Sequence, residues 1–307
     1  MDPLTHTLTG AVLSAAGFKQ KMGNIATVTL LAASIAPDID YAARLWGREI
    51  FLKYHRGPTH SIIGIVIISL IIALIVRYFT SYPRLMPLFM LSLLGTSVHV
   101  LMDITTAYGT KVFYPFSDRW YAWDVVFIID LWMYVVLFSG LLMIWRFKNL
   151  SITIASAVLI LIILYWGVRL VSHTKAIDTL IREYPASVSY GAFPNPANPF
   201  RWHAVVEKDN VFLKGNIDVL LPERGILSAL KKSDTTEIID ASKEARAVNI
   251  FLGFARYPYV TTEKTEDGFA VRWKDLRFDY LISKGRHFTA EAVVSDDGRI
   301  LRDGFWF

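Results

Sequence analysis

Long apolar runs confined to the first part of the chain constrain its fold more than any other feature. A helix needs about 20 mostly apolar residues to cross a bilayer. Four segments meet this requirement: 61–79, 85–105, 125–145 and 152–171. The rest of the chain alternates charged and apolar side chains, as soluble domains do. The sequence therefore predicts a transmembrane helical domain over 1–171 and an extramembrane domain over 172–307.

Two shorter apolar segments, 4–18 and 24–37, precede the four predicted spans. They are either tilted spans or a re-entrant pair buried against the other helices. In both cases the chain enters and returns, so the sidedness of the four later spans is the same. We therefore expect an α-helical polytopic membrane bundle, with four clear spans plus two short N-terminal apolar helices, followed by an α+β soluble domain.

The second domain shows strand periodicity with turn signals between the last strand pairs. Strands are expected at 202–207, 211–219, 257–263, 269–274, 287–294 and 300–306. Asp267-Gly268 and Asp297-Gly298 favour tight turns. One helix is predicted near 240–255, and the proline-rich stretch 190–200 is expected to be an entry loop.

Basic residues in the short turns indicate the orientation in the membrane. Lys19, Lys21, Arg77, Arg84, Arg146 and Lys148 lie in turns without acidic residues. Positive charge favours the cytoplasmic side, which puts the amino terminus, the other loops and the soluble domain outside. Met1 is followed by Asp2 rather than by a basic segment, so no signal peptide is evident. The prediction is a multi-pass protein of the cell (inner) membrane with an extracytoplasmic soluble domain.

The chain has no cysteine, which excludes thiolate zinc sites, disulfides and cysteine nucleophiles. The net charge of +5 agrees with anionic partners, but the placement of the charges is more informative. We expect no nucleic-acid partner. The sequence leaves the oligomeric state open.

Ionisable residues cluster at the ends of the predicted helices. Placing an ionisable side chain in or beside a membrane costs free energy, so such residues usually have a function. The candidates are His6, Asp38, Asp40, His55, His60, His99 and Asp103. Because the helices alternate in direction, all seven fall at the same membrane face. His99 and Asp103 share one helical face, and Asp38 and Asp40 would point the same way in an extended segment.

Imidazole nitrogens and carboxylate oxygens form a ligand set for zinc, manganese or iron. Seven candidates exceed one open tetrahedral site, so two or more ions would use them better, with an activated water as the nucleophile. Arg56 is expected to bind a substrate oxyanion. We count Arg56 and Asp40 as catalytic candidates, and Arg201 and His203 as residues that could cover the site and bind substrate.

Structural roles remain open for several of these residues. A histidine or aspartate at a helix end can act as a cap, and Arg56 can reach lipid headgroups. Asp124 is predicted to be an N-cap of the span at 125–145. Asp130 lies inside that span and could orient a ligating histidine. For Arg201 and His203 the alternative is an ordinary strand entry.

At these residues the sequence resembles the YdjM-type membrane-bound metal-dependent hydrolases. The matching pieces are THTLTG with His6, PDID with Asp38 and Asp40, HRGPTHS with His55 and His60, and the pair His99 and Asp103. YGTKVFYPFSDRW and NPFRWH also look like that family. The resemblance covers about residues 1–135 well and implies an inner-membrane hydrolase of a bacterium or archaeon. The motif order is distantly similar to that of zinc-dependent phospholipase C and its related zinc nucleases.

The leading hypothesis is a membrane-embedded metal-dependent hydrolase that cleaves a phosphoester or similar polar bond of a membrane lipid. Its cofactor would be a divalent metal, zinc first and manganese second. A metal-ion transporter would instead need polar groups along a path through the bilayer. A non-catalytic membrane scaffold would leave the histidine cluster unexplained.

Overall fold

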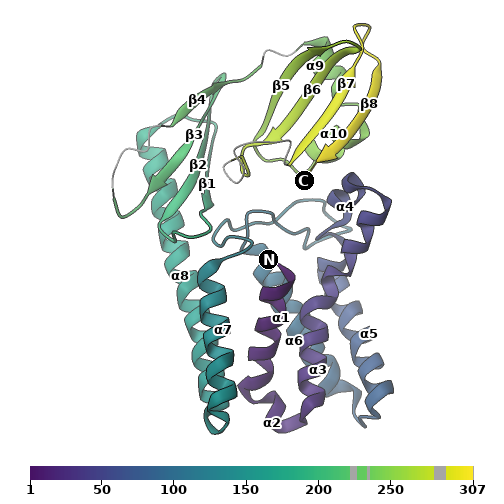
Figure 1. Cartoon of the computed structure of the whole chain (residues 1–307), viewed down its shortest axis with the longest axis vertical. Helices are drawn as coiled ribbons and strands as arrows, with labels where there is room; N and C mark the ends of the chain where they lie inside the picture. The colour runs from purple at the N-terminus through teal and green to yellow at the C-terminus, as the bar shows by residue number, and fades with distance from the viewer. Residues whose placement is uncertain (222–226, 234–235, 280–287, 307) are drawn as a thin grey trace. The chain divides into compact units, whose positions relative to one another are not determined.

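The computed structural model describes residues 1–221, 227–233, 236–279 and 288–306. The chain forms two compact units (Figure 1). The helical unit contains residues 1–40, 55–172 and 194–199. The sheet unit contains residues 41–54, 173–193 and 200–307. The chain therefore passes between the units several times, and the predicted single boundary after residue 171 stays a prediction.

Apolar helices build the helical unit. They are α1 (Pro3–Leu13), α3 (Asn24–Ile35), α5 (Ile62–Thr80), α6 (Leu85–Ile104), α7 (Leu131–Arg146) and the part of α8 (Ser151–Glu183) up to Ser172. The short polar helix α2 (Lys19–Met22) lies between α1 and α3. A π-helical turn, η1 (Ser14–Phe18), links α1 to α2 and kinks at Gly17, whose φ of 118° suits glycine. A 3-10 helix, η2 (Ala36–Trp46), continues α3.

Four helical stretches are long and apolar enough to cross a membrane: 24–46, 62–80, 85–104 and 148–183. Three of them match predicted spans. The remaining predicted span, 125–145, is shorter than expected, because its helix α7 begins at Leu131 rather than at residue 125. Asp130 is its N-cap and accepts hydrogen bonds from Trp132 N at 3.0 Å and Met133 N at 3.1 Å. Asp124, the predicted cap, has a left-handed φ of 58° outside any helix, so that prediction is wrong.

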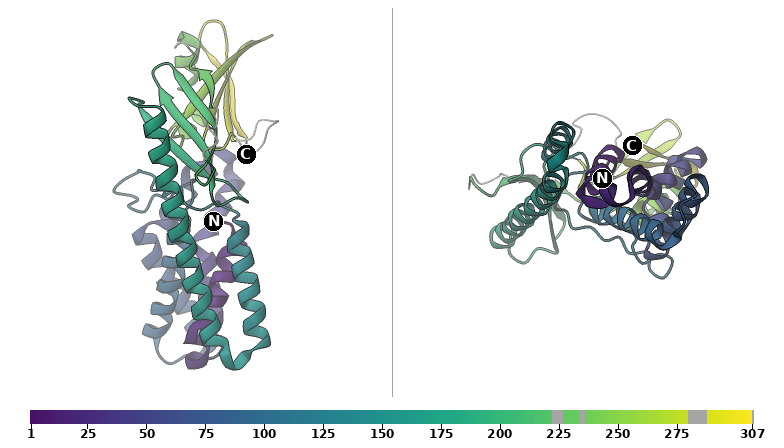
Figure 2. Two further views of the ribbon diagram at one scale, coloured as in Figure 1. Left: turned by 90° about the vertical axis from the view of Figure 1, so that its left-hand side faces the viewer. Right: turned by 90° about the horizontal axis from the view of Figure 1, so that it is seen from below.

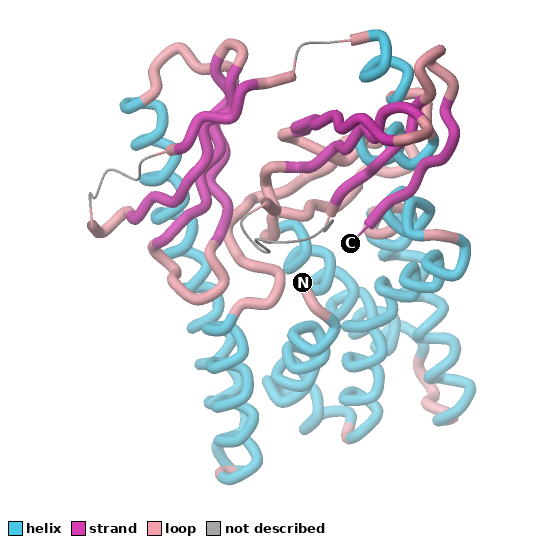
Figure 3. Tube along the Cα trace, turned by 45° about the horizontal axis from the view of Figure 1, so that its top comes forward, coloured by secondary structure: helices cyan, strands magenta, loops and turns pink. Residues whose placement is uncertain are grey.

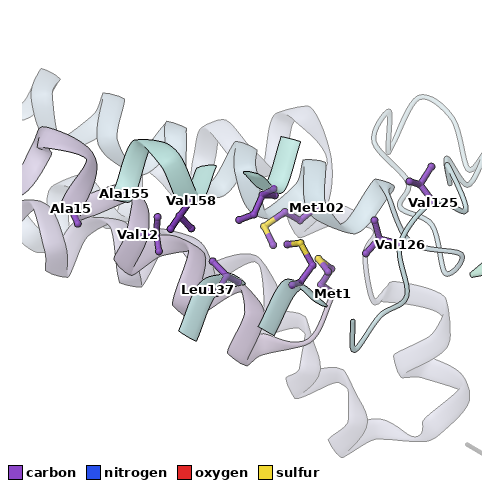
Figure 4. Close-up of a cluster of buried hydrophobic side chains, with 11 residues drawn as sticks. Met1, Val12, Ala15, Met102, Val125, Val126, Leu137, Ala155 and Val158 are labelled. Carbon is purple, nitrogen blue, oxygen red and sulfur yellow. The ribbon is translucent and has the colours of Figure 1, made fainter. Parts of the chain in front are cut away.

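The core of the helical unit joins α1, α6, α7 and α8 (Figure 4). Val12, Met102, Leu137 and Ala155 are among its buried members. Figure 2 shows α8 running beside α7. At that contact a Cβ on Gly140 would lie 2.3 Å from Val158 Cγ2, so a larger residue would force Val158 or the helices to shift.

Helices α3 and α6 approach closely at a glycine. A Cβ on Gly95 in α6 would lie 2.6 Å from the Cβ of Ala33 in α3. Small residues let helix backbones approach in this way. Because η2 follows α3, and His99 and Asp103 end α6, this contact sets the spacing between two ligand-bearing segments.

Two four-stranded antiparallel sheets build the sheet unit (Figure 3). Sheet one has the order β1 (Ser189–Pro194), β2 (Arg201–Lys208), β3 (Val211–Asp218), β4 (Ser228–Lys231). Sheet two has the order β5 (Pro258–Thr265), β6 (Gly268–Asp275), β7 (Thr289–Val294), β8 (Ile300–Trp306). Asp267-Gly268 and Asp297-Gly298 lie in the expected connections, with Gly268 at φ 139° and Gly298 at φ 82°. Residue 287, predicted to start a strand, lies outside the described residues.

Helices cover both sheets. The end of α8 packs Ala176 and Leu180 against Trp202 and Ala204 of sheet one. Sheet two packs against α9 (Glu237–Ser242) and α10 (Arg246–Leu252), and α4 (Arg48–Tyr54) packs on α10 and β8. The predicted helix at 240–255 is thus two short helices.

The expected entry loop at 190–200 is in part strand β1, because the first proline of that stretch falls only at Pro194, where the strand ends. The predicted fold class, an α-helical membrane bundle followed by an α+β domain, is confirmed.

Candidate metal centre

Helix ends bring the predicted ligands together within the helical unit. His6 lies in the first turns of α1, and Asp38 and Asp40 follow α3. His60 ends the 3-10 turn η3 (Pro58–His60) before α5, and His99 and Asp103 lie in the last turns of α6. Asp38 and Asp40 lie in a 3-10 helix and not in the extended segment that we predicted. They consequently face different partners.

Four side chains form a tight group that could hold a metal ion. Ligand atoms of Asp38, His60, His99 and Asp103 all lie within 4.8 Å of one another. The Nε2 atoms of His60 and His99 are 3.1 Å apart. Asp103 Oδ2 lies 3.1 Å from the first and 3.4 Å from the second. Asp38 Oδ1 lies 3.8 and 3.7 Å from the same two nitrogens. All four residues are buried.

Hydrogen bonds on the far side of each ring orient these two histidines. His99 Nδ1 donates to the Ser34 carbonyl oxygen at 2.7 Å. His60 Nδ1 donates to Thr59 Oγ1 at 2.9 Å and lies 3.3 Å from Asp40 Oδ2. A proton on each Nδ1 leaves each neutral Nε2 as an acceptor. Two acceptor nitrogens therefore face each other beside two carboxylates, an arrangement that a cation stabilises.

Burial favours the neutral form of His55 and His60, which both lie outside the apolar spans. It lowers the pKa of His60, against the opposing effect of its hydrogen bond to Asp40. Burial likewise lowers the pKa of His55 to about 3. Metal binding requires the neutral imidazole, so both rings are in the form that can bind a metal at pH 7.

Asp40 is surrounded by donors. Its Oδ1 accepts from His55 Nδ1 at 2.8 Å. Its Oδ2 accepts from Arg56 N and from Thr59 Oγ1, each at 2.9 Å. Asp38, Asp40 and His55 form a second group with ligand atoms within 4.8 Å. Because hydrogen bonds already use both Asp40 oxygens, this carboxylate is suited to orienting histidines.

Unpartnered buried atoms test whether the site fits a metal. His6 is 1% exposed, stacks on His99 with ring centres 3.7 Å apart, and has its Nε2 3.3 Å from Asp103 Oδ1. Within the described part of the chain, neither His6 ring nitrogen has a hydrogen-bond partner, and Asp38 Oδ2 and Asp103 Oδ2 also lack one. Buried polar atoms are costly when unsatisfied. A divalent cation satisfies nitrogens and carboxylate oxygens together, so the residues fit a metal.

Arg56 lies against the cluster rather than in open space. Its guanidinium nitrogen NH2 is 2.9 Å from Asp103 Oδ1, and NH1 donates to Thr106 Oγ1 at 3.0 Å. The Met1 amino group also contacts Asp103. Arg56 is 1% exposed. Its predicted role in binding substrate stays a prediction, while its observed contacts neutralise and hold a ligand.

Three further candidates are Asp130, Arg201 and His203. Asp130 accepts from Tyr165 OH at 2.9 Å and caps α7, so its predicted contact with a ligating histidine is wrong. Arg201 and His203 belong to the sheet unit, and His203 Nε2 donates to the Leu276 carbonyl oxygen at 3.0 Å. Their role in binding substrate stays a prediction.

Two contributors were absent from the sequence prediction. Thr59, inside HRGPTHS, donates to Asp40, and its place between two predicted ligands was a usable signal. Ser34 contributes only its backbone carbonyl to His99. No residue type encodes a carbonyl contact, so this partner had no signal in the sequence.

Comparison with known proteins places the chain in a family. A family model described as YdjM inner membrane protein matches residues 1–176, which include every residue of the cluster. The chain belongs to the YdjM inner membrane protein family. The match and the apolar helices make it a membrane protein, and the buried His/Asp group gives this YdjM family member a possible metal site.

Two further comparisons concern part of the sheet unit and the chain as a whole. A second family model, the YfhP C-terminal alpha/beta plait domain, matches residues 237–305. The chain is 27% identical to "Uncharacterized protein YfhP" of Bacillus subtilis (strain 168), over 96% of this chain and 90% of the relative. No solved structure gives a significant match.

Proposed function

We propose that this protein is a metal-dependent hydrolase that cleaves a phosphoester or related polar bond of a membrane lipid. The observation that carries the proposal is the pair of Nε2 atoms, on His60 and His99, lying 3.1 Å apart beside Asp38 and Asp103. Both rings are held by hydrogen bonds on their other nitrogens, to the Ser34 carbonyl oxygen and to Thr59 Oγ1. Such outer partners typically support metal-binding histidines.

Asp38, His60, His99 and Asp103 would hold the metal, with His6 as a further nitrogen donor. When bound, a divalent cation supplies Lewis-acid polarisation of a substrate oxygen and acidifies water. Nitrogen and carboxylate donors without thiolates favour zinc and also accept manganese. We propose one ion in this group, since the Asp40 oxygens of the second group are already hydrogen bonded.

Positioning residues would keep the donors in place. Asp40 supports the His60 ring, because it lies 3.3 Å from His60 Nδ1 and accepts from Thr59 Oγ1, the hydrogen-bond partner of that nitrogen. Arg56 holds Asp103 and offsets its charge at 2.9 Å. Pairing with an opposite charge offsets part of the cost of burying the Asp103 carboxylate.

The position of the group along the helices supports a lipid substrate. The donors lie at the beginnings of α1 and α5 and at the ends of α3 and α6, which is one end of an antiparallel bundle. A helix end lies near the headgroups of a bilayer that the helix spans. The bonds at that depth are the phosphoesters and other polar links of lipid headgroups.

A lipid-hydrolysis assay tests the proposal. Full-length protein loaded with Zn²⁺ is incubated with total lipid extract, and new products are identified by mass. We expect product from the wild type and a loss of more than about 100-fold in His60→Ala and Asp103→Ala. The control is His173→Gln, which changes a histidine of α8 that belongs to neither ligand group and should keep full activity.

Two results would contradict this function. One is a metal-loaded wild type that forms no lipid product, and the other is equal product from His60→Ala. Ion flux into liposomes that depends on His60, without lipid cleavage, would identify a transporter instead.

A further inference from the structure

One segment of the sheet unit interrupts the metal centre along the chain. Residues 41–54, called the strap here, link Asp40 to His55, yet they belong to the sheet unit. The chain leaves the helical unit after Asp40 and re-enters it at His55. Residues on both sides of the strap are therefore part of the candidate centre.

The part of the strap that forms α4 (Arg48–Tyr54), called its head here, packs within the sheet unit. Helix α4 packs against α10 and the edge strand β8. Phe51 is 2% exposed and Leu52 is 1% exposed. The Arg44 guanidinium carbon lies 4.5 Å from the centre of the Phe51 ring, and the Tyr41 ring centre lies 5.2 Å from it. Aromatic and cation–π contacts of this kind hold the first residues of the strap, Tyr41 and Arg44, against helix α4.

The residues that flank the strap, Asp40 on one side and His55 and Arg56 on the other, are called its neck here. Hydrogen bonds to the Asp40 carboxylate hold the two sides of the neck together. This carboxylate joins the last residue before the strap to the first two after it, His55 at 2.8 Å and Arg56 N at 2.9 Å. The same carboxylate lies 3.3 Å from His60 Nδ1 and accepts from Thr59 Oγ1, to which that nitrogen donates. One side chain thus closes the neck and orients a candidate metal ligand.

We propose that the sheet unit regulates the metal centre through the strap. A displacement of α4 on α10 pulls on both ends of the neck, separates Asp40 from His55, and releases the His60 ring from its oriented position. Metal affinity then falls. The coupling is reciprocal, because two linked equilibria must affect each other by the same factor. The inference rests on the proposed metal centre, and it goes beyond it by assigning a role to the sheet unit.

Metal affinity tests the coupling from the head. Zn²⁺ binding to full-length wild type, Phe51→Ala and Phe212→Ala is measured by competition with a chromophoric chelator. Phe212 is a matched control, 3% exposed on β3 of the other sheet. We expect Phe51→Ala to weaken Zn²⁺ binding about 10-fold and Phe212→Ala to change it less than about twofold. Unchanged affinity in Phe51→Ala, or an equal loss in both variants, overturns the inference.

Hydrogen exchange tests the coupling from the neck without metal. We expect Asp40→Asn to speed amide exchange in Arg48–Tyr54 about 10-fold, whereas His99→Ala leaves it unchanged. His99 is a matched control because it lies in the cluster but does not touch the neck hydrogen bonds at Asp40.

Unchanged exchange in Asp40→Asn, or an equal rise in both variants, overturns the coupling. A wild type that binds no Zn²⁺ overturns the proposed function instead, and the exchange measurement still decides whether the strap transmits motion.

Discussion

Buried histidines serve two different purposes in this protein. His60 and His99 turn acceptor nitrogens toward each other and toward two carboxylates. His203, also buried, donates from Nε2 to a backbone carbonyl and belongs to the packed interior of the sheet unit. Burial is therefore shared by both kinds, and the neighbouring donor atoms distinguish a candidate ligand from a structural histidine.

His203 predicts a pH dependence of stability. Burial lowers its pKa to about 4 from 6.5, so the unfolded chain binds a proton between these values and the folded chain does not. Stability therefore falls as the pH drops from 6.5 toward 4 and this contribution levels off below, a loss of roughly 3 kcal/mol. Chemical denaturation of full-length wild type and His203→Gln should show a shallower pH slope in the variant. Parallel slopes would contradict this assignment.

The sequence predicted the residue types of the centre but not their separate roles. Ionisable groups at the ends of apolar helices stand out because their burial is costly. Asp40 orients histidines because it lies in a 3-10 helix. The extended segment that we predicted would have pointed Asp38 and Asp40 the same way and given them the same role. Contacts of the Ser34 carbonyl depend on helix packing and leave no mark on side-chain identity.

At the scale of elements, the contact between α3 and α6 positions donors from both. Gly95 lies against Ala33 one turn before His99, and His99 in turn contacts the Ser34 carbonyl of α3. Helix boundaries were harder to predict than helix existence. Apolar composition extends from 125, but the cap at Asp130 starts α7 at Leu131.

Adding a methyl group at Gly95 should therefore disturb both packing and the centre. The new Cβ would lie 2.6 Å from Ala33 Cβ, so Gly95→Ala should cost about 1–3 kcal/mol and weaken Zn²⁺ binding. Gly167→Ala in α8 is the control, since no atom of the described residues lies within 4 Å of its Cβ position. Thermal unfolding and Zn²⁺ titration of both variants check this. A Gly95→Ala protein as stable as Gly167→Ala would argue against the close contact.

At the scale of the whole molecule, the chain combines an apolar helical unit with a unit of two sheets, and it passes between them more than once. The contrast in hydropathy between 1–171 and 172–307 made this combination predictable. The sequence did not predict that 41–54 belongs to the sheet unit and 194–199 to the helical unit, because the composition of a segment does not show which unit it packs against.

Orientation in the membrane is a prediction at this scale. The chain lacks cysteine, so single introduced cysteines can be labelled without background. We expect a membrane-impermeant maleimide to label Lys243→Cys in intact cells, and Lys21→Cys only after the membrane is opened. The reverse labelling pattern would place the sheet unit in the cytoplasm.

The metal content of purified full-length protein is the most direct test of the metal centre. We expect one tightly bound zinc or manganese ion per wild-type chain, near-complete loss in His60→Ala and Asp103→Ala, and retention in His173→Gln. A wild type that holds no more metal than His60→Ala, after reconstitution with Zn²⁺ and Mn²⁺, would contradict the assignment of these residues as ligands.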